Sequence, residues 1–248
     1  MFMKKDNELE KAKELAKLFL HMPVDTTEYS PMFITHPFWE SAFVSDGDGV
    51  FNLLEDKERY QKYQEYFSRK CLDTCVTLIQ LVYRFRKSFR LTFVDYLYKE
   101  HIISKITAGN LIADIWTTIE VVNHDVNVPK NRVLSYIQKA DKEIIMDENE
   151  KKVVNELPEV VTVYRGCESR AGLNGLCFTL NKNTAFWFAT RYQEKGFVME
   201  ATIGKNDIIA YKDSRGENEI ILDYRKLLSK KIEPAVRIVE RKIEPLSC

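Results

Sequence analysis

The sequence of 248 residues has no excess charge of either sign, because 37 Lys and Arg residues balance 37 Asp and Glu residues. It therefore lacks the overall positive field that non-specific nucleic-acid binding draws on, and such a role would need a local basic patch. Long hydrophobic runs are also missing. The most apolar window, residues 75–83, is far shorter than the roughly 20 residues of a membrane helix. Since the charged N-terminus is unlike an export signal, we expect a soluble cytoplasmic protein.

Cysteine, histidine and the common catalytic signatures are scarce or absent. The five cysteines are odd in number and form no CxxC pair, so the sequence indicates neither a disulfide framework nor a zinc site. The four histidines all precede residue 158, and there is no GxGxxG, P-loop, HExxH or GxSxG motif. The run from Asp46 to Gly49 lacks the further oxygen ligands of a calcium loop. We expect no metal.

The sequence changes in texture near Pro158, and this change predicts an α+β protein. Apolar residues recur at helical spacing before it, whereas short runs rich in β-branched residues follow it. We predict a helical N-terminal region at 1–157, for target or partner recognition, and a β-rich domain at 158–248. The expected helices cover residues 7–20, 57–90 with at most one break, 91–97, 102–119 and 132–145, with a loop at 23–48. The expected strands cover residues 160–164, 176–179, 197–203, 207–211 and 219–222.

The helical region contains one local basic cluster. Arg86, Lys87 and Arg90 would lie on one face of a helix with aromatic residues beside them. Such a surface can bind phosphates and stack on bases. It is equally an ordinary basic helix end, which the helix dipole favours.

An ordered series of short motifs runs through the β-rich domain. Tyr164-Arg165-Gly166 stands on the first expected strand, Cys177-Phe178-Thr179 on the second, and Glu217-Asn218-Glu219 at the start of the last. Because residues two apart in a strand point the same way, Glu217 and Glu219 are expected to face one cleft. An arginine on a neighbouring strand supplies a planar fork suited to a pyrophosphate or a carboxylate. A carboxylate so placed can stabilise the oxocarbenium-like charge that forms when the bond between nicotinamide and ribose breaks.

In the order and spacing of these motifs, the sequence resembles the mono-ADP-ribosyltransferase family, in the subclass with an arginine, a Ser-Thr-Ser motif and a Glu-x-Glu motif. The resemblance covers residues 159–223 and implies a split β-sandwich with short helices and NAD as co-substrate, with no metal. It extends in its general pattern to phage- and defence-associated bacterial proteins. It thereby implies a toxin or antiphage effector with a possible neutralising antitoxin.

The resemblance also implies roles for individual residues. Glu219 would be catalytic, holding the ribose 2′-hydroxyl and stabilising the transition state, and Glu217 would orient or deprotonate the acceptor. Arg165 would contact the dinucleotide phosphates and brace the cleft. The remaining cofactor-binding residues would be Tyr164, Gly166, Cys177, Phe178 and Thr179.

Two features beside these motifs complete the expectation. Cys177 stands where serine is usual, and Leu180 follows Thr179 where the family has its second serine. Ala185, Phe188, Ala189 and Tyr192 follow helical spacing and predict a packing helix, with Arg191 as a candidate contact to the phosphates.

The expected function is transfer of ADP-ribose from NAD to an intracellular macromolecule, either a nucleic-acid base, as in RNA, or a protein arginine. Two alternatives remain: NAD glycohydrolysis, in which water replaces the acceptor, and a catalytically silent binding module on the same fold.

Overall fold

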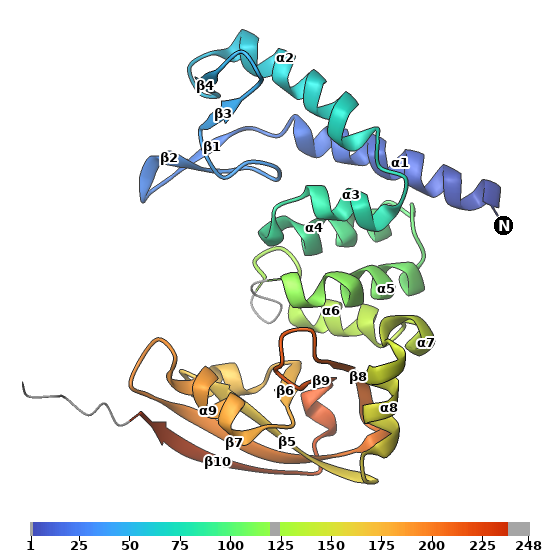
Figure 1. Ribbon diagram of the computed structural model, residues 1–248, viewed down its shortest axis with the longest axis vertical. Helices are drawn as coiled ribbons and strands as arrows, with labels where there is room; N and C mark the ends of the chain where they lie inside the picture. The colour runs from blue at the N-terminus through green and yellow to red at the C-terminus, as the bar shows by residue number, and fades with distance from the viewer. Residues whose placement is uncertain (1, 120–124, 238–248) are drawn as a thin grey trace, which may run out of the picture. The chain divides into compact units, whose positions relative to one another are not determined.

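The computed structural model describes residues 2–119 and 125–237 of the chain (Figure 1). It divides into two compact units, Met1–Asp141 and Lys142–Cys248. This division lies earlier than the expected boundary at 157/158, because the two short helices that follow residue 141 pack on a strand of the second unit. Helices and an antiparallel sheet together confirm the α+β class.

The first unit is built mainly from helices around an aromatic core. The ring of Phe19 on the first helix makes edge contacts with Phe85 and Phe93, at centroid distances of 5.5 and 5.7 Å, and Phe85 stacks on Phe93 at 4.0 Å. Aromatic pairs of this kind add to the stabilisation from buried apolar area. The elements of this unit are α1 (Phe2–Leu20), β1 (Asp25–Thr27), β2 (Ser30–Thr35), β3 (Phe43–Ser45), β4 (Val50–Asn52), α2 (Lys57–Phe67), η1 (Ser68–Leu72), α3 (Leu78–Arg84), α4 (Lys87–Lys99), α5 (Lys105–Ile115), η2 (Trp116–Thr118) and α6 (Lys130–Ile137).

Two expectations for this unit were wrong. The segment 23–48 is not a plain loop, because β1 pairs with β2 and β3 pairs with β4 as small antiparallel sheets. The region is therefore not all helical. The stretch 57–90 is interrupted by the π-helix η1 and by turns before α3 and α4, so it is not one helix with a single break.

The basic cluster of this unit is structural. The Arg86 guanidinium donates to the carbonyl oxygens of Ile34 and Trp39, at 3.2 and 3.1 Å, and also to the Glu40 carboxylate at 3.1 Å. Arg90 donates to the backbone carbonyl of Phe85 at 3.2 Å. Both guanidinium groups therefore bind protein oxygens, and these contacts do not favour a phosphate-binding surface at Arg86 and Arg90.

The second unit is a six-stranded antiparallel sheet in the order β10-β7-β5-β6-β9-β8. The strands β10, β7 and β5 pair over eight residues each, whereas β5 and β6 are joined by one register pair, Tyr164 with Thr179. The sheet thus consists of two three-stranded halves that meet at a single point. The elements are α7 (Lys142–Ile145), α8 (Glu148–Glu156), β5 (Val160–Cys167), η3 (Arg170–Leu173), β6 (Cys177–Thr179), α9 (Lys182–Thr190), β7 (Lys195–Gly204), η4 (Lys205–Asp207), β8 (Ile208–Lys212), β9 (Glu219–Leu222), η5 (Tyr224–Lys226) and β10 (Ser229–Val236).

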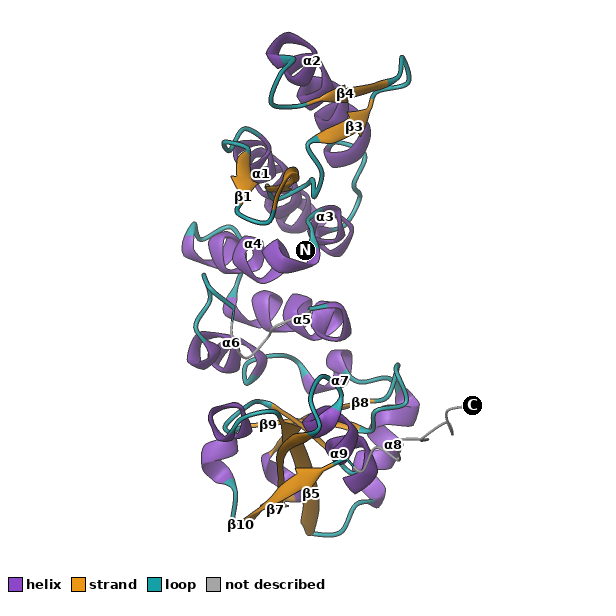
Figure 2. Ribbon diagram, turned by 90° about the vertical axis from the view of Figure 1, so that its left-hand side faces the viewer, coloured by secondary structure: helices purple, strands orange, loops and turns teal. Residues whose placement is uncertain are grey.

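Helix α9 packs closely on β5, β7 and β10 (Figure 2). Its buried residues Ala185 and Ala189 form a small core cluster with Val198 and Ala235. The approach is close because the strands present glycine there: a Cβ on Gly166 would overlap the backbone carbonyl of Ala185. Gly166 therefore serves helix–sheet packing, and its expected cofactor contact stays a prediction.

Candidate functional site

Three of the expected site residues lie in one row where the two halves of the sheet meet. Tyr164 on β5 is paired with Thr179 on β6, and Thr179 is paired with Glu219 on β9. Directly paired residues of an antiparallel sheet carry their side chains on the same face. The structure thereby brings one residue from each of the three sequence motifs onto a common face.

Thr179 ties the second motif to the third. It is 5% exposed, its Oγ1 donates to the backbone carbonyl of Glu217 at 2.6 Å, and the same oxygen accepts from the Asn181 N–H at 3.0 Å. A hydroxyl that both donates and accepts fixes its own rotamer. Thr179 consequently holds the chain just before β9 in place.

The expectation that strand alternation relates the carboxylates of Glu217 and Glu219 is wrong. Strand β9 begins at Glu219, and Asn218 before it has a φ of 47°, in the left-handed region. Asparagine tolerates this conformation better than most residues, and here its side-chain Oδ1 accepts from the Tyr211 hydroxyl at 2.9 Å. Glu217 thus belongs to a turn, whereas Glu219 belongs to the sheet.

Glu217 and Glu219 nevertheless influence one another electrostatically. The pKa of Glu217 is raised, first by burial, and the neighbouring charge of Glu219 raises it further. The guanidinium groups of Arg215 and Arg191 act against this rise. Glu219 itself is 7% exposed. The site therefore holds two carboxyl groups within electrostatic range, one of them poised to carry a proton more readily than an ordinary glutamate.

Arg165 acts as a brace between the two halves of the sheet. Its Nε donates to the Gly172 carbonyl at 2.8 Å, and its Nη1 donates to the Cys177 carbonyl on β6. The guanidinium fits there because residue 175 is glycine; a Cβ at this position would overlap the guanidinium. In strand alternation Arg165 belongs to the face opposite Tyr164, so the cations that act on Glu217 are Arg215 and Arg191.

The remaining residues of the second motif are less suited to ligand contact. Phe178 is 2% exposed and lies 5.9 Å from the Arg165 guanidinium, measured from Cζ to the ring centroid. It is a core residue beneath the brace, and its expected cofactor contact stays a prediction. Cys177 is partly exposed, pairs with Ile221, and contributes its backbone carbonyl to Arg165.

Aromatic side chains are exposed at the end of α9, where the sequence predicts a packing face. Of the four residues expected to pack, Ala185 and Ala189 are buried and Phe188 is partly buried, whereas Tyr192 is 76% exposed. The neighbouring Trp187 is 56% exposed. The Arg191 guanidinium lies over the rings of Trp187, Phe188 and Tyr192, at 5.6, 4.9 and 4.5 Å from the centroids. The sequence shows Arg191 three residues after the aromatic run 186–188, but only the fold shows that Arg191 acts on Glu217.

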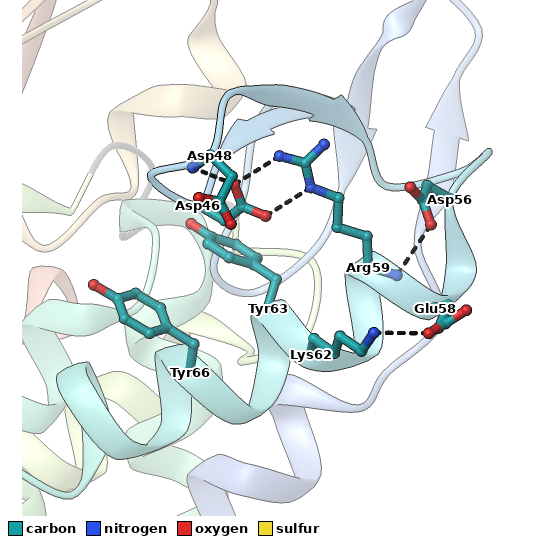
Figure 3. A pocket seen from close by; sticks show the side chains of 8 residues that line it. All are labelled: Asp46, Asp48, Asp56, Glu58, Arg59, Lys62, Tyr63 and Tyr66. Carbon is teal, nitrogen blue, oxygen red and sulfur yellow. Dashed lines mark hydrogen bonds and ion pairs between the residues drawn. The ribbon is translucent and has the colours of Figure 1, made fainter.

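The first unit has a polar pocket of about 560 Å³ (Figure 3). The Asp46 carboxylate accepts two hydrogen bonds from Arg59, each 2.7 Å long, and Lys62 pairs with Glu58 at 2.7 Å. These ion pairs neutralise much of its acidic lining. In the described parts of the chain no group of three or more His, Cys, Asp or Glu side chains could hold a metal ion. The lining residues are Asp46, Asp48, Asp56, Glu58, Arg59, Lys62, Tyr63 and Tyr66.

Comparisons with known proteins give no match: no family model, no curated protein and no solved structure is similar to this chain. Across residues 2–119 and 125–237, none of the helices has the length and apolar character needed to span a bilayer.

Proposed function

We propose that the second unit is an NAD-dependent mono-ADP-ribosyltransferase. The observation that carries this proposal is the row of Tyr164, Thr179 and Glu219 at the only pairing point between β5 and β6 in the described sheet. The buried Glu219 carboxylate thus lies at the junction of the two halves of the sheet, where we place the NAD site. The turn that carries Glu217 adds a second carboxyl group beside it.

The proposed chemistry needs one carboxylate that stays ionised and one group that accepts a proton. Glu219 stabilises the developing positive charge on the nicotinamide ribose, as carboxylates do in glycoside cleavage. Glu217 takes the proton from the acceptor, and its raised pKa suits it to that role. Tyr164, Thr179 and Cys177 lie on the same face of the sheet at this junction, and no metal is required by this mechanism.

Two arginines have separate roles in the proposal. Arg165 keeps the halves of the sheet in position through the carbonyls of Gly172 and Cys177. Arg191, partly surrounded by aromatic rings, offers a guanidinium to the pyrophosphate of NAD and rings to its flat groups. The helical first unit would recognise the acceptor or a neutralising antitoxin protein, in keeping with a toxin or antiphage effector acting in the cytoplasm.

The test is to incubate the full chain with NAD labelled in its adenylate part and a cell lysate, and then to digest with nuclease or protease. Retained label that protease releases indicates a protein acceptor, and label that nuclease releases indicates RNA or DNA. Glu219→Gln is expected to abolish labelling. Glu233→Gln, which changes a partly exposed glutamate on the edge strand β10, is the matched control and should label normally.

Two results would overturn transfer in favour of the alternatives. Free ADP-ribose as the sole product would indicate NAD glycohydrolysis. Absence of NAD binding in calorimetry, together with Glu219→Gln indistinguishable from the parent protein in cell toxicity, would indicate a silent binding module.

A further inference from the structure

A guanidinium of the chain itself lies against the carboxyl group to which we assign acceptor activation. Arg215 Nη2 is 3.6 Å from Glu217 Oε2, with the two side chains 49% and 25% exposed. At 3.6 Å the pair is looser than a direct hydrogen bond, so the guanidinium is near the carboxylate without being locked to it. This is the position in which an arginine acceptor would meet Glu217.

The turn between β8 and β9 holds Arg215 there. The Gly216 N–H donates to the Asp213 carbonyl at 2.9 Å, and the Asn218 N–H donates to the Asp213 carboxylate at 3.0 Å. Gly216 and Asn218 both have positive φ, at 67° and 47°, so the chain folds back sharply. Arg215 thus lies in an ordered turn that holds its side chain near Glu217.

We propose that Arg215 is a self-modification site, the intramolecular acceptor of ADP-ribose in this chain. The inference rests on the proposed transferase function and names its first acceptor. A bond forms between the Nη2 of Arg215 and C1′ of the nicotinamide ribose, while the bond from C1′ to the nicotinamide nitrogen breaks. The bonding electron pair leaves with nicotinamide, and the guanidinium proton passes to the Glu217 carboxylate. A tethered acceptor reacts at a high effective concentration.

A second arginine of the same unit shows why the neighbouring carboxyl group matters. Arg225 pairs with Asp223 at the same two-residue spacing, but at 2.8 Å, and this pairing lowers the pKa of Asp223. A carboxyl group with a lowered pKa is a poor proton acceptor. The pKa of Glu217 is raised instead, because burial outweighs the lowering effect of Arg215, so Glu217 is the better proton acceptor of the two carboxyl groups. Arg225 is therefore the natural control.

The experiment uses the purified full chain with NAD labelled in its adenylate part, and measures nicotinamide release and the modified peptide in the same reaction. Mass spectrometry of the digest should place ADP-ribose on Arg215, with a labelled fraction independent of protein concentration. Arg215→Lys, which keeps the charge and removes the guanidinium, should lose the self-label. Arg225→Lys should keep it.

Each outcome decides the inference. Nicotinamide release with label on another residue, or labelling that rises with protein concentration, overturns self-modification and leaves the transferase proposal standing. Self-label that persists in Arg215→Lys overturns it as well. If the parent protein releases no nicotinamide, both proposals fail together.

Discussion

Replacement of Arg165 by lysine is expected to loosen the sheet of the second unit. Lysine keeps the positive charge, but its single ammonium group cannot reproduce the fork that reaches the carbonyls of Gly172 and Cys177. A hydrogen bond from a charged donor contributes about 2 kcal/mol, so losing one of the two should lower the free energy of unfolding by about that amount. The loss falls on the junction between β5 and β6, where one register pair joins the halves.

Hydrogen exchange read by mass spectrometry is the suitable assay, because it follows this unit separately from the helical one. Amide protection in β5 and β6 should fall in Arg165→Lys by about the factor of thirty that 2 kcal/mol represents. Arg225→Lys alters an ion pair between an exposed guanidinium and the buried Asp223 carboxylate, and neither residue belongs to β5 or β6, so protection in those two strands should change little.

A coupling measurement sharpens this test. Gly175→Ala would place a Cβ against the Arg165 guanidinium, so it disturbs the same brace from the other side. The two substitutions together should cost less than the sum of the two measured separately. Strict additivity, or equal protection in Arg165→Lys and Arg225→Lys, would refute the idea that Arg165 holds the halves together.

Three further predictions concern buried or crowded positions. Burial lowers the pKa of His36 to about 4 from 6.5, so the unfolded chain binds a proton at this imidazole at a higher pH than the folded chain does. The free energy of unfolding of the helical unit, measured by thermal denaturation, should therefore fall by about 3 kcal/mol between pH 6.5 and 4. His36→Phe should remove this pH dependence. Gly166→Ala should cost about 3 kcal/mol or more in urea unfolding, because its Cβ meets the Ala185 carbonyl, whereas Gly204→Ala, with its nearest atom at 3.4 Å, should be nearly neutral. The raised pKa of Glu217 should place the acid limb of the transfer rate above pH 4.5, and a limb at or below that value contradicts its role as the base.

Most strands of the second unit could be predicted, because β-branched runs have a local signature. The exception is β10 (Ser229–Val236), whose Lys230, Lys231 and Pro234 weaken that signature. These are residues that protect an exposed edge from further pairing, and β10 does lie at the edge of the sheet. The residues that prevent further pairing at this edge thus also make the strand hard to predict from the sequence.

The basic cluster shows a different reason for failure. Arg86 has the charge and the aromatic sequence neighbours expected of a phosphate contact. Its hydrogen-bond partners, the carbonyls of Ile34 and Trp39, lie about fifty residues earlier in the sequence. Carbonyl oxygens have no side-chain identity, so nothing in the sequence marks them as acceptors for a distant guanidinium. Only the fold separates an arginine that satisfies the backbone from one that is available to a ligand.

The geometry of the candidate site differs from the one that strand alternation predicts. Strand alternation would have placed Glu217 and Glu219 side by side in equivalent surroundings. Instead Asn218 turns the chain in the left-handed region, so that Glu219 is buried at the start of a strand and Glu217 lies in a turn next to Arg215. Two chemically identical residues consequently receive different burial and different charged neighbours. Glu-x-Glu in a regular strand could not provide this difference, and the proposed mechanism depends on it, because that mechanism assigns charge stabilisation to one carboxyl group and proton transfer to the other.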